Sequence, residues 1–236
     1  MSKVKKNMKA YCIILDWDGV IANSLHAQFD WFRHICTQFK KNFPYKNQED
    51  FRADSRRTSI IQTYIALRFD WEKDKCAIWE EYKKYPHSQP ILFDNIETTL
   101  HSLHQEFSLS IASSSKPEKI LSKLDELRLT SLFDSIITCY DVPEIDGHPP
   151  LKPDPSILIH TLQKIRCSPR NAAYIGDEPG DIEASRRVAE VLEHRMYSLA
   201  STYGYTTREI LAHARPDGFV DHHTQIAREV RRVFSI

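Results

Sequence analysis

Glycine and paired cysteines are scarce in this 236-residue sequence. It has six glycines, and its five cysteines are scattered, with no Cys-x-x-Cys pair. An odd, dispersed set of thiols argues against both a disulfide framework and a zinc site. We therefore expect reduced, mostly structural thiols and a cytoplasmic protein.

The sequence also lacks a surplus of charge and a long apolar run. Lysine and arginine total 32, as do aspartate and glutamate, so no overall field attracts nucleic acid or an anionic membrane. No segment approaches the length of a membrane span. The lysines of residues 1–9 are not followed by the apolar core of a signal peptide, and we expect them to be a solvated start. The partner predicted is a small molecule, with no nucleic acid and no membrane, and the oligomeric state stays open.

Short apolar, β-prone runs alternate with helical patterns along most of the chain. Six such runs lie at about 10–16, 107–112, 134–139, 171–175, 194–200 and 217–221. This alternation predicts an α/β fold with a doubly wound, mostly parallel, Rossmann-like sheet. Parallel strands are covered on both faces, which explains why these runs are nearly continuously apolar.

One long interruption breaks this alternation. Between Ile21 and about Pro90 the chain shows no strand signal but helical patterns at 25–40, 55–69 and 71–85. After the prolines at its end, Asp94 is placed to cap a helix that runs to about residue 106.

We interpret the interruption as a helical cap domain, residues 22–90, inserted after the first strand of a core domain made of residues 1–21 and 91–236. Caps of this kind exclude water and select the substrate. The alternative is a helical layer packed on one side of the sheet.

Two carboxylates follow the first strand. The apolar residues 13–15 lead into Asp16, Trp17, Asp18 and Gly19. In open α/β sheets ligands bind at the carboxyl ends of the strands, where one acid can act as nucleophile or metal ligand and another as proton carrier. On its own, Asp-x-Asp-Gly equally fits a calcium loop or an ordinary turn.

Polar residues end later strands as well. The second strand runs into Ser113, Ser114 and Ser115 just before an expected helix, where hydroxyls and free amides form an anion site, unless the serines only cap the helix. After the third strand, Lys152 is flanked by Leu151 and Pro153, and the restricted backbone can aim its ammonium group, although a lone loop lysine is usually solvated.

The fourth strand ends in Gly176, Asp177 and, four residues later, Asp181. An acid in the first turn of a helix is usually a cap, whereas Asp177 would lie at a strand tip level with Asp16. Three of the six glycines flank these acid pairs, which indicates a backbone that turns sharply or approaches a ligand closely.

These four motifs together resemble the haloacid dehalogenase superfamily of phosphotransferases. They occur in the family's order as DWDGV, SSS after LSIA, the lysine of LKPDP, and GDEPGD. A helical insert after the first motif is similar to the family's first cap type. The segments STYGYTTRE and PDGFVD near the carboxyl end look like those of phosphoglycolate-phosphatase-like members.

The resemblance implies a role for each matching residue. Asp16 would be the nucleophile that forms an aspartyl-phosphate, and Asp18 would carry the proton. Mg²⁺ would be bound by Asp16, Asp177 and Asp18, the last through its main-chain carbonyl. Ser113, Ser114 and Lys152 would bind the phosphoryl group, Lys152 as part of the catalytic set. Asp181 would support Lys152 or a metal-bound water.

The cap should select the substrate. Arg52 or Arg56 could reach a second anionic group, or could belong to a solvated basic helix end. We expect Trp31, Trp71 and Trp79 to form the core of the cap rather than to stack on a substrate.

The function implied is a Mg²⁺-dependent phosphatase that acts on a small phosphorylated metabolite such as phosphoglycolate. The nearest alternative is a sugar-phosphate mutase of the β-phosphoglucomutase type, which shares the aspartyl-phosphate. A remoter one is a non-catalytic phospho-accepting or binding protein. The early position of Asp16 and the insert argue against a receiver-like signalling domain.

Overall fold

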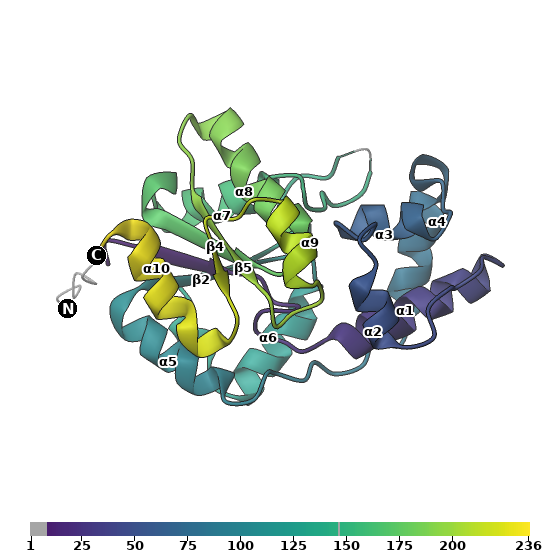
Figure 1. Ribbon diagram of the computed structural model, residues 1–236, viewed down its shortest axis with the longest axis horizontal. Coiled ribbons are helices and arrows are strands. Elements are labelled where there is room, and N and C mark those ends of the chain that lie inside the picture. The colour runs from purple at the N-terminus through teal and green to yellow at the C-terminus, as the bar shows by residue number, and fades with distance from the viewer. Residues whose placement is uncertain (1–8, 146) are drawn as a thin grey trace, which may run out of the picture.

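A six-stranded parallel sheet forms the centre of the protein (Figure 1). The computed structural model describes residues 9–145 and 147–236, so most of the lysine-rich start lies outside the described residues. The strands are β1 (Cys12–Leu15), β2 (Ser108–Ser113), β3 (Ser135–Thr138), β4 (Ala172–Gly176), β5 (Tyr197–Ser201) and β6 (Gly218–Val220). Their order in the sheet is β3-β2-β1-β4-β5-β6, and the predicted doubly wound α/β fold is confirmed.

The register of the strands gathers their carboxyl ends at one edge. Leu15 at the end of β1 lies beside Ile111 of β2 and Ile175 of β4. The amide of Asp16 continues this pairing by donating to the carbonyl oxygen of Ile175 at 2.9 Å. The residues that follow these strands are therefore brought close together, although they are far apart in the sequence.

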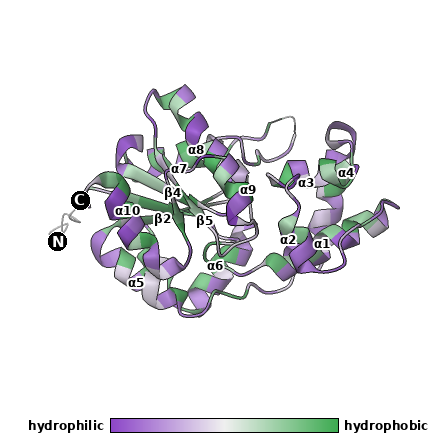
Figure 2. Ribbon diagram, viewed as in Figure 1, coloured by the Kyte–Doolittle hydropathy of each residue, from purple (hydrophilic) through white to green (hydrophobic). Residues whose placement is uncertain are grey.

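Helices cover both faces of the sheet. On one face, α5 (Ile96–Glu106), α6 (Pro117–Glu126) and α10 (Ile226–Phe234) pack against Ile13 and Leu15. On the other face, α7 (Ser156–Ile165) and α8 (Pro179–Leu192) pack against Ile14, and α9 (Arg208–His213) packs beside α8. Because successive strand residues point to opposite faces, adjacent residues of β1 enter different halves of the core. Figure 2 shows the corresponding mixture of hydrophobic and hydrophilic residues on the helices.

The short 3₁₀ turns are η1 (Thr130–Leu132), η2 (Cys139–Asp141), η3 (Pro169–Asn171) and η4 (His223–Gln225).

Four helices lie between β1 and α5 in the chain and stand to one side of the sheet (Figure 1). They are α1 (Leu25–Gln38), α2 (Gln48–Ala53), α3 (Ile60–Ala66) and α4 (Trp71–Lys84). Their apolar faces share a buried cluster of their own, which includes Phe32, Phe51 and Tyr64. The division of the chain into a core domain and a cap domain stays a prediction.

The predicted start of the insert's second helix, at residue 55, was wrong. The pattern at 55–69 gives α3 only from Ile60, because the hydroxyl of Ser59 accepts the amide of Gln62 and starts the helix there. The preceding helix, α2, was not predicted, and the side chain of Asn47 caps it by accepting the amide of Asp50.

Asp94 does not cap α5, contrary to the sequence interpretation. The N-cap is Asn95, which has a positive φ of 61° and forms no side-chain cap hydrogen bond. The main-chain oxygen of Asp94 instead accepts a hydrogen bond from His223. Among the helices of the described chain, none is long and apolar enough to cross a membrane.

His223 joins the carboxyl-terminal part of the chain to the start of α5. The residue is only 3% exposed, and its ring has Nδ1 2.7 Å from the hydroxyl of Thr99 and Nε2 3.0 Å from the carbonyl oxygen of Asp94. Burial lowers the pKa of His223, with a smaller contribution from the neighbouring His222. The native state therefore favours the neutral ring.

We predict that His223 makes folding stability sensitive to mild acid. Below the pKa of an unfolded histidine, about 6.5, the unfolded chain binds a proton that the folded chain resists, so stability falls as the pH falls. Between pH 7.5 and 5.5, His223→Gln should lose less stability than the wild type by about 1 kcal/mol in urea unfolding. His101→Gln, at an exposed position of α5, serves as the control. Identical pH dependence in all three proteins would contradict the prediction.

Candidate active site

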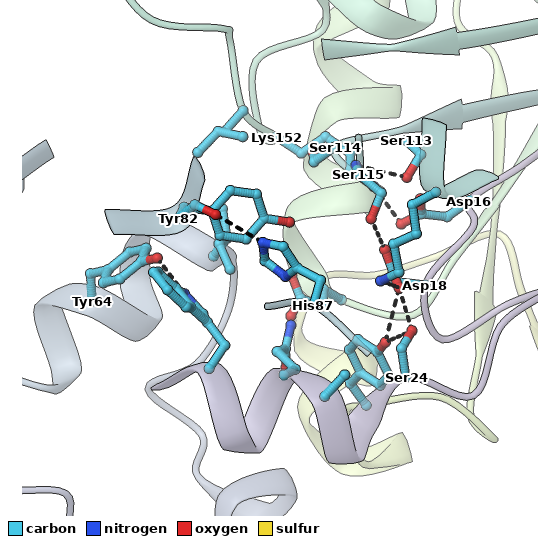
Figure 3. A pocket seen from close by; sticks show the side chains of 18 of the residues that line it. Asp16, Asp18, Ser24, Tyr64, Tyr82, His87, Ser113, Ser114, Ser115 and Lys152 are labelled. Carbon is cyan, nitrogen blue, oxygen red and sulfur yellow. Dashed lines mark hydrogen bonds and ion pairs between the residues drawn. The ribbon is translucent and has the colours of Figure 1, made fainter. Parts of the chain in front are cut away.

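A cavity of about 160 Å³ lies where the carboxyl ends of the strands face the inserted helices (Figure 3). The predicted site residues that line it are Asp16, Asp18, Ser113, Ser114, Lys152 and Asp177. Asp181 lies behind them and contacts Lys152. The structure thus brings together seven residues from four separate motifs.

The ammonium group of Lys152 is the centre of the polar contacts. It lies 2.5 Å from Oδ2 of Asp16, 2.6 Å from Oδ1 of Asp181 and 2.8 Å from the hydroxyl of Tyr174. Burial alone would lower the pKa of Lys152, but the two carboxylates raise it well above its ordinary value. Lys152 therefore stays charged, and the cis peptide bond to Pro153 belongs to the loop that carries it.

Asp16 is held by one contact on each carboxylate oxygen. Oδ1 accepts the amide of Trp17 at 2.7 Å, while Oδ2 faces Lys152. Burial raises the pKa of Asp16 to about 7, against the opposing attraction of Lys152. The side chain is oriented at the edge of the cavity, as an oxygen nucleophile must be.

Three buried carboxyl groups form a candidate metal centre. Oxygen atoms of Asp16, Asp177 and Asp181 all lie within 4.8 Å of one another. Burial, followed by the negative charges of Glu178 and Asp181, raises the pKa of Asp177 well above its ordinary value. Hard oxygen donors with uncompensated negative charge fit a divalent cation such as Mg²⁺. Within this cluster, Oδ2 of Asp181 accepts the amides of Asp177 and Glu178, both at 2.9 Å, and its Oδ1 contacts Lys152.

The carboxylate of Asp18 lies outside this cluster and has a separate set of donors. Oδ1 accepts one hydrogen bond from the hydroxyl of Ser24 and a longer one, of 3.5 Å, from the hydroxyl of Tyr205. Oδ2 accepts one from the hydroxyl of Ser115. Lys119 lies 3.5 Å from Oδ1. Burial would raise the pKa of Asp18, but Lys119 and the serine hydroxyls lower it, which favours the carboxylate form.

These partners of Asp18 were not assigned a role from the sequence. Ser115 belongs to the serine run and could have been chosen with its neighbours. Ser24, Lys119 and Tyr205 carry no local motif that distinguishes them from helix caps or surface residues. They reach Asp18 only through the packing of α1, α6 and the segment after β5.

The serine run does not cap α6. The helix begins at Pro117 with Lys116 as its N-cap, so Ser113 and Ser114 remain on the loop that faces the cavity. Ser113 accepts the amide of Ser115 at 3.1 Å. The hydroxyl oxygen of Ser114 is shielded from solvent and has no hydrogen-bond partner, which suits an incoming anionic oxygen.

Two glycines allow the backbone to approach Asp177. Gly19 has a φ of +74°, and a β-carbon there would lie 2.0 Å from Oδ2 of Asp177. At Gly204, after β5, a β-carbon would lie 2.4 Å from the β-carbon of Asp177. The close approach expected at Gly19 is therefore present, while that at Gly204 was not foreseen.

Arg52 and Arg56 do not line the cavity. The guanidinium group of Arg52 donates to the carbonyl oxygen of Thr202 at 2.7 Å. That of Arg56 is largely exposed and pairs with Asp54 at 2.6 Å. Both side chains are directed to other partners, so the geometry gives no support to their predicted contact with substrate.

The three tryptophans of the insert line the cavity together with the catalytic candidates. Trp31 also belongs to the buried apolar cluster of the insert, and Trp71 packs against it. The expectation that they form only the core of the insert was therefore incomplete, because the same rings have a second face toward the cavity.

Comparison with known proteins identifies the family pattern. The model of the haloacid dehalogenase-like hydrolases matches residues 13–190. A curated phosphoglycolate phosphatase of Vibrio cholerae is 33% identical over 138 residues, which are 58% of this chain and 56% of that protein. The chain thus matches a little more than half the length of this relative.

Solved structures share the fold over nearly the whole chain. A Bacteroides fragilis protein described as a haloacid dehalogenase-like hydrolase has a TM-score of 0.74 and 22% identity, and the match covers 92% of this chain and 100% of that one. A Bacteroides vulgatus protein described as a β-phosphoglucomutase has a TM-score of 0.68 and 16% identity, covering 97% and 91%. At these identities the likeness shows the fold alone.

We predict that a side chain at Gly19 disrupts the site as well as the backbone. Gly147→Ala is the matched control, because Gly147 has a similar φ of +78° but nothing within 4 Å of a β-carbon. The control should cost about 1 kcal/mol of unfolding free energy from strain alone. Gly19→Ala should cost about 1–3 kcal/mol more, since Asp177 must move. Equal losses in denaturant unfolding would show that the contact with Asp177 is unimportant.

Proposed function

The chain belongs to the haloacid dehalogenase-like hydrolase family, and on this basis we propose that it is a Mg²⁺-dependent phosphatase of a small phosphorylated metabolite. The observation that carries the proposal is the oriented carboxylate of Asp16, which lines the same cavity as Asp18. The similarity to curated phosphoglycolate phosphatases supports phosphate ester hydrolysis.

In the first half of the proposed reaction, a carboxylate oxygen of Asp16 attacks phosphorus. A new P–O bond forms an aspartyl-phosphate, and the bond from phosphorus to the leaving alkoxide breaks. Asp18 donates its proton to that alkoxide. Because Ser24, Ser115 and Lys119 favour the ionised form of Asp18, this network must loosen as substrate enters and Asp18 gains its proton.

In the second half, Asp18 is a carboxylate and takes a proton from water. The resulting oxygen nucleophile attacks phosphorus, releases inorganic phosphate and restores the carboxylate of Asp16. The hydrogen bonds seen around Asp18 in the structure suit this second half. One residue serves both steps because it holds the proton between them.

Charge repulsion is the main obstacle to this chemistry, since a carboxylate must approach a phosphate dianion. Mg²⁺ held by Asp16, Asp177 and the main-chain carbonyl of Asp18 would supply positive charge there. Lys152 adds a fixed cation beside Asp16, and Asp181 keeps that cation in place. The hydroxyls of Ser113 and Ser114 face the cavity and could bind phosphoryl oxygens.

The inserted helices would act as a cap in this proposal. Trp31, Tyr64 and Trp79 close the side of the cavity opposite the strand ends. Closure over the acids would keep bulk water from the aspartyl-phosphate and would strengthen the contacts of Lys152.

We predict that Asp16→Asn abolishes catalysis. The amide cannot act as the nucleophile, so Mg²⁺-dependent phosphate release from a panel of phosphomonoesters should fall at least about 10³-fold. Asp30→Asn, which changes a half-exposed aspartate of α1, should retain activity. Phosphate release by the wild type that persists in EDTA or in Asp16→Asn would refute the proposal. Isomerisation of a sugar phosphate without phosphate release would instead indicate a mutase.

We also predict that Mg²⁺ raises the melting temperature through Asp177. At a concentration 100 times the dissociation constant, the ion should stabilise the wild type by about 2.7 kcal/mol. Asp177→Asn should lose most of this stabilisation and, without metal, should be at least as stable as the wild type, because a repelled buried carboxylate has been removed. Asp30→Asn should keep the full response to Mg²⁺, and an equal response in Asp177→Asn would exclude the proposed ligand.

A further inference from the structure

The side of the cavity formed by the inserted helices is a wall of rings, here called the aromatic wall. Its members are Trp31, Tyr64, Trp71, Trp79, Tyr82 and His87. Figure 3 shows Tyr64, Tyr82 and His87 on this side, across from Asp16 and Asp18. A leaving group attached to a phosphate at Asp16 would extend toward these rings.

The rings of the aromatic wall hold one another in place. The centroid of Tyr82 lies 5.1 Å from that of Trp31 and 4.2 Å from that of His87. Tyr64 and Trp71 are stacked at 5.4 Å with 26° between their planes. Trp31 Nε1 donates to the hydroxyl of Tyr64 at 2.8 Å, which links the two groups. Such pre-formed flat surfaces bind a ring with little loss of side-chain entropy.

The aromatic wall offers no permanent charge to a substrate. Among the described residues of the insert that line the cavity, none is a lysine, an arginine or an acid. Burial lowers the pKa of His87, which keeps its ring neutral near pH 7.

The arginines of the insert have other partners. Arg52 and Arg56 contact Thr202 and Asp54. The guanidinium of Arg57 lies 3.3 Å above the ring of Phe51 and donates to its carbonyl oxygen at 2.5 Å. A carboxylate on the leaving group would therefore find no guanidinium partner from the insert.

The cations of the opposite side are also engaged. The lining contains four carboxyl groups but two ammonium groups, those of Lys119 and Lys152. Lys119 faces Asp18, and Lys152 faces both Asp16 and Asp181. A second negative charge on the substrate would enter a space already rich in acids, at a cost in desolvation.

We propose that the leaving group of the substrate is an uncharged alcohol that carries a flat unsaturated ring, so that the substrate is the phosphate ester of a ring-bearing alcohol rather than a carboxylated one such as phosphoglycolate. This inference rests on the proposed phosphatase function and deepens it. The aromatic wall binds the ring while the strand ends bind the phosphate.

The kinetic test compares benzyl phosphate with 2-phosphoglycolate in the presence of Mg²⁺. Both release unactivated alcohols, so the comparison reports on binding of the leaving group. Burial of one ring predicts a kcat/KM about 10- to 100-fold higher for benzyl phosphate. Cyclohexylmethyl phosphate, of similar size but not flat, should fall between the two. A higher kcat/KM for 2-phosphoglycolate would overturn the inference.

Variants of the aromatic wall locate the effect. Tyr82→Leu and Trp79→Leu should each lower, about tenfold, the ratio of kcat/KM for benzyl phosphate to kcat/KM for 2-phosphoglycolate, whatever their effect on closure of the cavity. Phe43→Leu, which alters a ring of the insert's apolar cluster that does not line the cavity, is the control and should leave the ratio of the two substrates unchanged. Circular dichroism and melting temperatures check folding, and an unchanged ratio in folded Tyr82→Leu and Trp79→Leu would contradict the role of the wall.

A binding measurement separates failure of this inference from failure of the proposed function. Isothermal titration of the Mg²⁺-loaded wild type with 2-phenylethylphosphonate and 3-phosphonopropionate needs no turnover. If 2-phenylethylphosphonate binds at least about tenfold more tightly than 3-phosphonopropionate but no phosphate ester is hydrolysed, the inference is supported and the proposed phosphatase function is refuted. Equal or tighter binding of 3-phosphonopropionate would refute the inference even if phosphate esters were hydrolysed.

Discussion

The buried ammonium group of Lys152 is the contact on which the rest of the site depends. It lies between Asp16 and Asp181, and those two acids stand with Asp177 in a space that water scarcely reaches. The cation offsets part of the cost of burying these carboxyl groups, while burial still raises the pKa of Asp16 to about 7 and that of Asp177 well above its ordinary value. The same ammonium group orients Asp16, the proposed nucleophile. Positive charge beside the acids and alignment of Asp16 therefore come from a single side chain.

The fold and much of the site could be predicted from the sequence because both depend on local patterns. Each of the six apolar runs became a strand within a few residues of its expected bounds. Parallel pairing then placed Asp16, Ser113 and Asp177 at the same edge, since adjacent strands end together. The family's motif order supplied Lys152, whose loop has no periodic pattern to place it.

The remainder depended on packing between distant segments. Nothing near Tyr205 or Lys119 in the sequence shows that either approaches Asp18, because α6 and the segment after β5 come together only in the folded chain. The contacts of the insert's arginines depend on packing in the same way. Arg52 finds a carbonyl oxygen at Thr202, 150 residues away, and a composition-based argument sees only a basic helix end.

Tyr205 has a consequence for how the two proposed half-reactions are linked. Its amide donates to Asp177 at 2.6 Å, while its hydroxyl reaches Ser24 and Asp18. Tyr205 thereby touches both a candidate metal ligand and the proposed proton carrier, and it lies beyond residues 13–190, which match the family model. A shift of the loop after β5 would therefore change the surroundings of the Asp177 carboxylate and of the Asp18 carboxylate at the same time. The two properties cannot change independently as the sequence diverges. The chain after residue 190 therefore constrains the candidate site, although the charged residues of that site all precede it.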